Sequence, residues 1–320
     1  MIIKAKPEEF QVDEIWENLS LGGGCYSYCW LTKENYTVQK AVDLLCEFFG
    51  IKHKDVGFAG TKDKYAVTRQ LISLKNVKKE RIEKFSRDWI KLEFVGFHNE
   101  PVSLGSHQGN RFIIVVRDVE KKQVVPKIFI NYYGPQRFSQ GNVEIGKSII
   151  LRKYQKAVEL LFLYGCDYKS AMDEYLLQYP NDYLGALQKI PLKLLKLYVQ
   201  AYQSFLWNET AKSILEKGEV KNEKIPLVGF DTVIGDDEVS RIIKKILEKE
   251  KITTRDFVNQ QFKKMSLEGG ERTVLIDVKG LSVGELEDDE MNSGKKKMKI
   301  TFTLGKSSYA TEVIRQLFPQ

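Results

Sequence analysis

The periodicity of the apolar residues changes twice along the chain, and this change constrains the fold more than any other feature. Strand-like and helical patterns alternate through the first part of the chain, helical patterns fill the middle, and strand-like patterns return near residue 273. This order predicts one α+β sheet domain built from both ends of the chain and interrupted by a mostly helical insertion. We expect the sheet domain to comprise residues 1–140 and 265–320, and the insertion to comprise residues 141–264.

Local signals predict several individual elements. Thr37 is a favoured N-cap, the apolar residues that follow it have helical spacing, and Gly50 is a favoured helix end, so a helix is expected between them. Further helices are predicted at 192–217, 238–249 and 310–317. Runs rich in β-branched and aromatic residues predict strands at 26–32, 66–74, 90–97, 111–119, 273–278 and 298–303.

The composition is that of a folded protein outside a membrane. Of the 320 residues 42% are hydrophobic and 29% are charged, so the chain can bury a core without disulfides or metals. The first residues are not apolar enough for a signal peptide, and no later run is long enough to span a bilayer. We therefore expect a cytoplasmic protein with no membrane partner.

The cysteines and histidines do not predict a metal site. Cys25 and Cys29 are spaced as CxxxC within a strand-like run, but none of the three histidines has the spacing needed to complete a ligand set. Small buried thiols in a reducing compartment are the favoured interpretation.

The charge is compatible with a polyanionic partner. The net charge is +7, and basic residues cluster at 75–84, 193–196, 241–251 and 295–299. Each cluster taken alone is also typical of a solvated helix face or loop. An acidic run at 285–290 has no role that its sequence suggests.

The segment GFAGTKDK (57–64) has unusual chemistry, because it places the carboxylate of Asp63 between two lysines in a glycine-punctuated loop. Such a loop can direct a carboxylate into a cleft, but a purely structural turn has the same composition. A phosphate-binding P-loop is disfavoured, because the spacing GxxxxGK[ST] is not met.

Two further segments combine amides, arginines and aromatic rings. Residues 108–112 (QGNRF) could read the edge of a base and stack on its face, or could be a glycine turn that enters a core strand. Residues 131–138 (NYYGPQRF) have a composition suited to RNA contact and equally suited to a structured connection between domains.

Five segments together resemble one known family. KAKPEEFQVDE (4–14), GFAGTKDKYAVTRQ (57–70), LGSHQGNRF (104–112), NYYGPQRFSQGN (131–142) and LGKSSYATEVIRQLF (304–318) occur in the order seen in the TruD family of tRNA pseudouridine synthases. The segment AYQSFLWNE (201–209) also resembles part of the family's insertion domain. The motifs span nearly the whole chain.

This resemblance implies a site and a fold. The aspartate of the family's GxKD motif is its catalytic residue and corresponds to Asp63. Residues that line the uridine site in the family correspond to Phe10, Asn110 and Tyr309, where some members carry Phe in place of Tyr309. Phe112 and Lys4 match further recurring positions. The implied fold is a pseudouridine synthase core with a mixed, mainly antiparallel sheet and flanking helices, interrupted by the TruD-specific insertion domain.

The implied reaction is the isomerisation of a uridine in tRNA, at position 13 in the family, to pseudouridine. It neither gains nor loses atoms, so we expect no cofactor, nucleotide or metal. A non-catalytic RNA-binding or chaperone protein on the same fold is the alternative, with Asp63 fixing the loop through a neighbouring lysine. A metal-dependent nuclease is disfavoured, because Asp63 has no partner carboxylate nearby in sequence.

Overall fold

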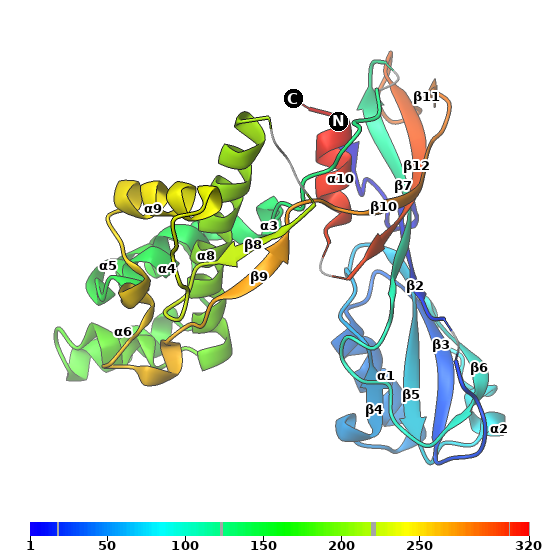
Figure 1. Ribbon diagram of the computed structural model, residues 1–320. Helices are drawn as coiled ribbons and strands as arrows, with labels where there is room; N and C mark the ends of the chain where they lie inside the picture. The colour runs from blue at the N-terminus through cyan, green and yellow to red at the C-terminus, as the bar shows by residue number, and fades with distance from the viewer. Residues whose placement is uncertain (18, 122–123, 219–221, 307, 320) are drawn as a thin grey trace. The chain divides into compact units, whose positions relative to one another are not determined.

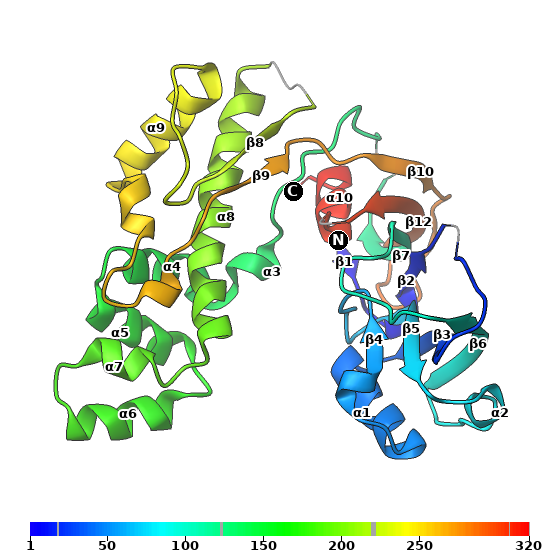
Figure 2. The ribbon, with the colours of Figure 1, turned by 60° about the horizontal axis from the view of Figure 1, so that its bottom comes forward.

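The chain divides into two compact units, each with its own packing. The computed structural model describes residues 1–17, 19–121, 124–218, 222–306 and 308–319, with the backbone alone for Gln140. Unit 1 comprises Met1–Lys127 and Asp277–Gln320, and unit 2 comprises Ile128–Ile276 (Figures 1 and 2). The predicted limits of the insertion, residues 141 and 264, fall inside unit 2.

The segments that enter and leave unit 2 pair with each other, which explains why this unit is longer than the predicted insertion. The main-chain N–H of Asn131 donates to the carbonyl of Val274 at 2.7 Å, and the N–H of Ile276 donates to the carbonyl of Phe129 at 2.8 Å. The predicted strand at 273–278 is therefore wrong for most of its length. Residues 274–277 connect two shorter strands, one ending at Thr273 and the other beginning at Val278. Val274 and Ile276 are buried in this connection, which accounts for the strand-like pattern.

Unit 1 is built on one mixed sheet. The sheet order is β10-β12-β7-β2-β5-β3-β6, with β1 on β7, β11 on β12 and β4 on β5. Only β2 and β5 pair in parallel among the described strands, so the prediction of a mixed, mainly antiparallel sheet is confirmed. The strands are β1 (Ile2–Ile3), β2 (Phe10–Ile15), β3 (Tyr26–Glu34), β4 (Val56–Phe58), β5 (Val67–Lys75), β6 (Ile90–His98), β7 (Gly109–Val119), β10 (Val278–Val283), β11 (Glu287–Asp288) and β12 (Lys296–Gly305).

Helix α1 (Val38–Phe49) confirms the prediction made from its ends. Thr37 Oγ1 accepts a hydrogen bond from the N–H of Lys40 at 3.1 Å, and Gly50 closes the helix in the left-handed region, with φ 67°. The apolar side of α1 packs on β3 and β5 in one buried cluster, which includes Leu31, Leu45 and Ile72. Unit 1 also contains α2 (Lys79–Ile82), α10 (Ala310–Leu317) and the 3-10 turns η1 (Pro7–Glu9) and η2 (His53–Asp55). Both α1 and α10 lie on the same side of the sheet (Figures 1 and 2).

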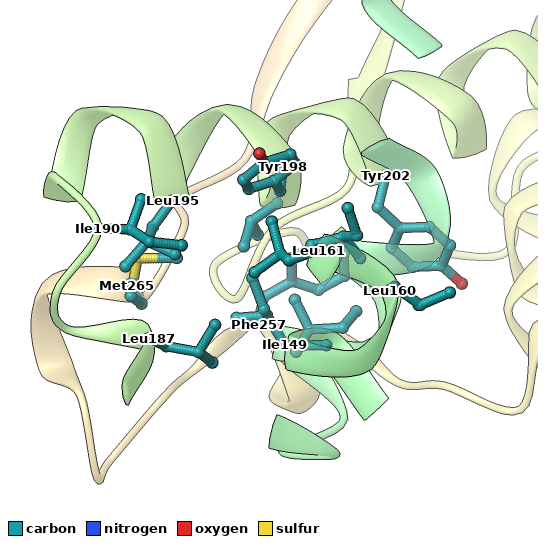
Figure 3. Close-up of a cluster of buried hydrophobic side chains, with 14 of the residues drawn as sticks. Ile149, Leu160, Leu161, Leu187, Ile190, Leu195, Tyr198, Tyr202, Phe257 and Met265 are labelled. Carbon is teal, nitrogen blue, oxygen red and sulfur yellow. The ribbon is translucent and has the colours of Figure 1, made fainter. Parts of the chain in front are cut away.

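Unit 2 is mostly helical and is organised around its longest helix, α8. Side chains from α4, α5, α8 and the segment after α9 meet in one apolar core, in which Leu161, Tyr202 and Phe257 are almost fully buried (Figure 3). The elements are α3 (Pro135–Phe138), η3 (Ser139–Gly141), α4 (Asn142–Ile150), α5 (Tyr154–Tyr164), α6 (Lys169–Gln178), α7 (Tyr183–Leu187), α8 (Leu192–Glu216), β8 (Lys224–Leu227), α9 (Glu238–Glu250), η4 (Thr254–Phe257), η5 (Lys263–Met265) and β9 (Gly270–Thr273).

Candidate active site

The loop that carries Asp63 joins β4 to β5 and is tied to the sheet through its main chain. Gln70 Nε2 donates to the carbonyl of Gly60 at 3.2 Å, and Lys33 Nζ donates to the carbonyl of Asp63 at 2.9 Å. Both side chains are fully buried. The two anchors fix the backbone on either side of Lys62.

The carboxylate of Asp63 is held separately, by Lys4. Asp63 Oδ2 accepts a hydrogen bond from Lys4 Nζ at 3.0 Å, and the Asp63 side chain is 39% exposed. The carboxylate is therefore paired with a cation and remains accessible from solvent. Lys4 has φ 57°, in the left-handed backbone region, which costs a residue with a side chain on the order of 1–3 kcal/mol.

A row of aromatic rings lies below Lys4. Lys4 Nζ is 4.1 Å from the centroid of the Phe10 ring, a cation–π distance. The Phe10 ring meets Phe112 edge-on with centroids 6.3 Å apart, and Phe112 stacks on Phe302 at 5.4 Å. Phe10 is only 1% exposed, so its ring forms a covered apolar floor under the lysine.

Glu14 links the Asp63 loop to Asn110. Lys62 Nζ donates to Glu14 Oε1 at 2.5 Å, and the Glu14 side chain is completely buried. Its other oxygen accepts from the Trp16 indole at 2.9 Å and from the N–H of Leu71 at 3.1 Å. Glu14 on β2 is the direct register partner of Asn110 on β7, and such partners share one face of the sheet.

The side-chain amide of Asn110 is not fully satisfied by hydrogen bonds among the described residues. Its Oδ1 makes no hydrogen bond within the described part of the chain, although the atom is buried. Buried polar atoms in native proteins normally have a partner. Within the described ranges the Asn110 oxygen lacks a hydrogen-bond donor, and a bound substrate is one source of such a donor.

His107 marks the point where other motif segments meet. The ring is nearly buried, and its Cε1 lies 3.9 Å from the position a β-carbon would take on Gly60. Burial lowers the pKa of His107, Glu14 raises it, and Lys62 and Lys306 lower it further. Lys306 Nζ also donates to the carbonyl of Gly105 at 2.8 Å. The segments at 57–70, 104–112 and 304–306 therefore adjoin one another.

The structure thus connects most of the predicted site residues. Asp63, Lys4, Phe10 and Phe112 form one chain of direct contacts, and Asn110 joins it through Glu14 and Lys62. Tyr309 is half-buried and immediately precedes α10. Ser307, within the last motif, lies outside the described residues.

Four residues around the loop were not singled out from the sequence: Glu14, Lys33, Gln70 and His107. In the observed strands, each of the first three stands at a position that alternation places on the buried face. Only Gln70 lies within a strand predicted from the sequence, because β2 was not predicted and the predicted strand at 26–32 ends before Lys33. A charged or amide residue at such a position requires a nearby partner. The partners could not be identified, because they come from distant parts of the chain.

The segment at 131–138 uses its polar groups within unit 2. Arg272 donates to the carbonyl and to the side-chain oxygen of Asn131, and its guanidinium lies 4.1 Å from the centroid of the Tyr133 ring. Asn208, in the segment 201–209, exchanges two hydrogen bonds with the main chain of Tyr133. These contacts favour the structural interpretation, in which the segment fastens the start of unit 2 to α8.

The acidic run at 285–290 has a structural role in unit 1. Asp289 and Glu290 bind Arg117, which is 2% exposed and also binds Glu9. Lysines of the neighbouring basic run pair with acids, Lys296 with Asp288 and Lys297 with Glu290. This basic cluster is therefore largely neutralised within the protein.

The described residues contain no group of three or more His, Cys, Asp or Glu side chains suited to a metal ion.

Cys29 is buried, which raises the pKa of its thiol to about 12, whereas Cys25 is exposed, contrary to the expectation that both are buried. Within the described part of the chain, no helix has the length and apolar character needed to cross a bilayer.

A family profile and individual relatives of known name all indicate the same family for this chain. The profile of the family described as tRNA pseudouridine synthase D (TruD) matches residues 1–168, 162–225 and 219–317. A protein of Methanocaldococcus jannaschii named probable tRNA pseudouridine synthase D 2 is 32% identical over 399 aligned positions, which cover 99% of this chain and 92% of that protein. The tRNA pseudouridine synthase D of Aquifex aeolicus is 28% identical, covering 99% of this chain and 97% of that protein.

A solved structure agrees in fold. The crystal structure of a Methanosarcina mazei protein assigned to TruD matches with a TM-score of 0.82, covering 99% of this chain and 93% of that chain at 24% identity. The 399 aligned positions of the M. jannaschii comparison exceed the 320 residues of this chain, so that relative carries segments that this chain lacks.

Proposed function

Because the chain belongs to the tRNA pseudouridine synthase D (TruD) family, we propose that it is an isomerase that converts a uridine of tRNA to pseudouridine, with Asp63 as the catalytic carboxylate. The supporting observation is the state of Asp63 itself. Its carboxylate is paired with Lys4, which itself lies over the Phe10 ring, and the Asp63 side chain remains accessible to a substrate.

The reaction explains why one carboxylate suffices. The bond from N1 of uracil to C1′ of ribose breaks, the base turns, C5 bonds to C1′, and the proton on C5 leaves while N1 gains one. No atom is added or removed, so the chain needs no group-carrying or redox cofactor. Attack on C1′, addition to the ring and removal of the 2′ proton each require an ionised carboxylate beside the nucleoside.

The neighbouring residues fit distinct tasks in this proposal. Lys4 orients the carboxylate, and Phe10 with Phe112 forms the apolar floor that supports Lys4 and excludes water. Asn110 reads the edge of the detached uracil with its unsatisfied amide, and Tyr309 provides an aromatic surface at the start of α10. Holding the base while it rotates prevents its loss to solvent.

The proposed substrate is folded tRNA in the cytoplasm, modified at uridine 13. The target atom is hidden in structured RNA, so the nucleotide has to be flipped out at a cost of a few kcal/mol. Lysines that contact phosphates offset part of this cost. The family resemblance supports both the tRNA substrate and the position.

The test compares Asp63→Asn with the wild type on tRNA that carries tritium at C5 of uracil. We expect the variant to bind tRNA as the wild type does, and tritium release to fall by at least roughly 10²–10⁴-fold, because the amide cannot act as a base or nucleophile. Asp88→Asn, at an exposed position of unit 1, is the matched control and should keep full activity.

Retained release by Asp63→Asn would remove Asp63 from the mechanism. Binding without release by the wild type would support the non-catalytic RNA-binding alternative. Mass spectrometry of the treated tRNA locates the product, and a tRNA with cytidine at position 13 should remain unmodified if the position is correct.

A further inference from the structure

Lys33 lies in a strand position that normally holds an apolar residue. It follows Cys29 and Leu31 on the buried side of β3, and it is 0% exposed. Cys29 and Leu31 belong to a buried cluster with α1, whose members Val38 and Ala41 are apolar. Burying an ammonium group in such surroundings costs several kcal/mol, and a leucine or methionine would pack there without that cost.

The ammonium of Lys33 binds the main chain of the Asp63 loop. Its Nζ donates to the carbonyl oxygen of Asp63 at 2.9 Å, and not to a carboxylate. On the adjacent strand, the equally buried Gln70 donates to the carbonyl of Gly60. Lys33 is the register partner of Thr68, and Leu31 is that of Gln70, so both anchors rise from the same face of the sheet.

We propose that Lys33 is a positioning residue for the isomerisation, one that fixes the main chain of Asp63 from below while Lys4 orients the carboxylate. The inference rests on the proposed function of Asp63. It explains why a charged group is kept in the core: the two lysines define the position of Asp63 at its backbone and at its carboxylate. A carboxylate displaced by about 1 Å can lose on the order of 100-fold in rate.

Lys33 also gives the site a characteristic dependence on pH. Burial lowers the pKa of Lys33 to about 8, Asp63 raises it, and Lys62 lowers it. Its cross-strand neighbours, Thr68 on β5 and Ile90 on β6, carry no charge. Above pH 8 the side chain loses its proton, the charge-assisted hydrogen bond to the Asp63 carbonyl weakens, and the rate should decline.

The experiment measures single-turnover tritium release from tRNA between about pH 6.5 and 9.5. For Lys33→Met, of similar length and apolar, we expect the rate at pH 7 to fall by roughly 100-fold with the tRNA affinity unchanged, and the decline near pH 8 to disappear. Lys91→Met, at an exposed position of the neighbouring strand β6, should behave as the wild type. Titration of the uridine itself affects all the proteins alike and so cancels in the comparison.

Gln70→Leu serves as a second variant. It removes the other anchor but keeps Lys33, so the rate should fall while the decline near pH 8 remains. A wild-type rate and pH profile in Lys33→Met would overturn the positioning role and leave the proposed function intact. The role is also overturned if Lys33→Met fails to fold and the wild type shows no decline near pH 8. Absence of release by the wild type would refute the proposed function, and this inference with it.

Discussion

Three lysines shape the surroundings of Asp63, and each binds a different kind of acceptor. Lys4 binds the carboxylate, Lys33 binds the main-chain carbonyl, and Lys62 binds the buried Glu14. A lysine side chain loses much conformational freedom when it is fixed, on the order of 2 kcal/mol. Lys4 and Lys33 bind the Asp63 loop from other parts of the chain, and Lys62 binds from within it. Three fixed lysines indicate that the loop is held rigid at a considerable cost in stability, as expected for a preorganised site.

Gly57 on β4 and Gly60 in the loop that follows provide a matched pair of substitutions. A β-carbon on Gly57 would collide with the carbonyl oxygen of Val102 and lie 2.5 Å from Ser73 Oγ, whereas one on Gly60 would have its nearest neighbours at 3.9 Å. We therefore expect Gly57→Ala to lower the free energy of unfolding by about 1–3 kcal/mol, as overpacking does. Gly60→Ala should stay within about 0.5 kcal/mol of the wild type. Urea denaturation measures both, and equal stability of the two variants would contradict the packing at Gly57.

At the scale of elements, the hairpin of β11 and β12 is connected to the start of β2 by a buried charge network. Arg117 on β7 lies between Glu9, which immediately precedes Phe10, and Asp289, which follows β11. Asp289 also accepts hydrogen bonds from the Asn292 side chain and the N–H of Asp118. The network joins three segments of unit 1 that lie far apart in the sequence.

Removal of Arg117 should destabilise unit 1 strongly. Arg117→Met leaves two buried carboxylates without a counter-charge, which typically costs about 3–5 kcal/mol. Burial opposes the ionisation of Asp289, but hydrogen bonds from Asn292, from main-chain N–H groups and from Arg117 outweigh it and hold its pKa below the ordinary 3.8. The stabilisation is therefore fully present above about pH 4 and is lost as the pH falls further.

We accordingly expect the difference in unfolding free energy between wild type and Arg117→Met to be largest near neutral pH and to shrink below about pH 4. Guanidinium titrations at several pH values measure it. Arg87→Met, at an exposed position, should change stability by no more than about 0.5 kcal/mol. A difference that stays constant down to about pH 2 would mean that the network does not act through ionised carboxylates.

The sequence predicted the elements that have local signals at their ends, and it missed those whose burial depends on contacts with distant residues. Helix α1 was predicted in full because its cap at Thr37 and its end at Gly50 are local signals. Strand β2 was missed because Asp13 and Glu14 make it look polar, although Glu14 is buried against Lys62. The motifs pointed to Asp63 through family resemblance, whereas Lys33 binds it across 30 residues of chain, which local patterns do not reveal.

At the scale of the whole molecule, the basic clusters differ in how many of their lysines form ion pairs with acidic residues of the protein, and so in how much positive charge they offer to a polyanion. Lys295 pairs with Glu120 and its neighbours pair with acids, so the cluster at 295–297 offers little free charge. In unit 2, Lys193 is exposed and Lys196 partly exposed, and neither makes an ion pair within the described part of the chain. Unpaired lysines are the ones that can replace counterions on RNA.

This difference predicts how tRNA binding depends on salt. The affinity of the wild type should fall steeply as salt rises. Lys193→Gln with Lys196→Gln should reduce the magnitude of the negative slope of log affinity against log salt by about 0.7–0.9 for each phosphate that the removed lysines neutralise. Replacing Lys295, Lys296 and Lys297 by Gln should leave the slope nearly unchanged. Fluorescence anisotropy at several salt concentrations measures the slopes, and equal effects of the two sets would contradict the assignment.

The position of β12 in the sheet sets an order of events during synthesis. This strand lies between β10 and β7, yet it is made long after β7, because the whole of unit 2 comes between them. While the ribosome completes unit 2, the emerging chain carries β7 with an unpaired edge, the kind of surface that invites wrong strand pairing. A nascent chain stalled before residue 296 should thus depend on chaperones more than the finished protein does.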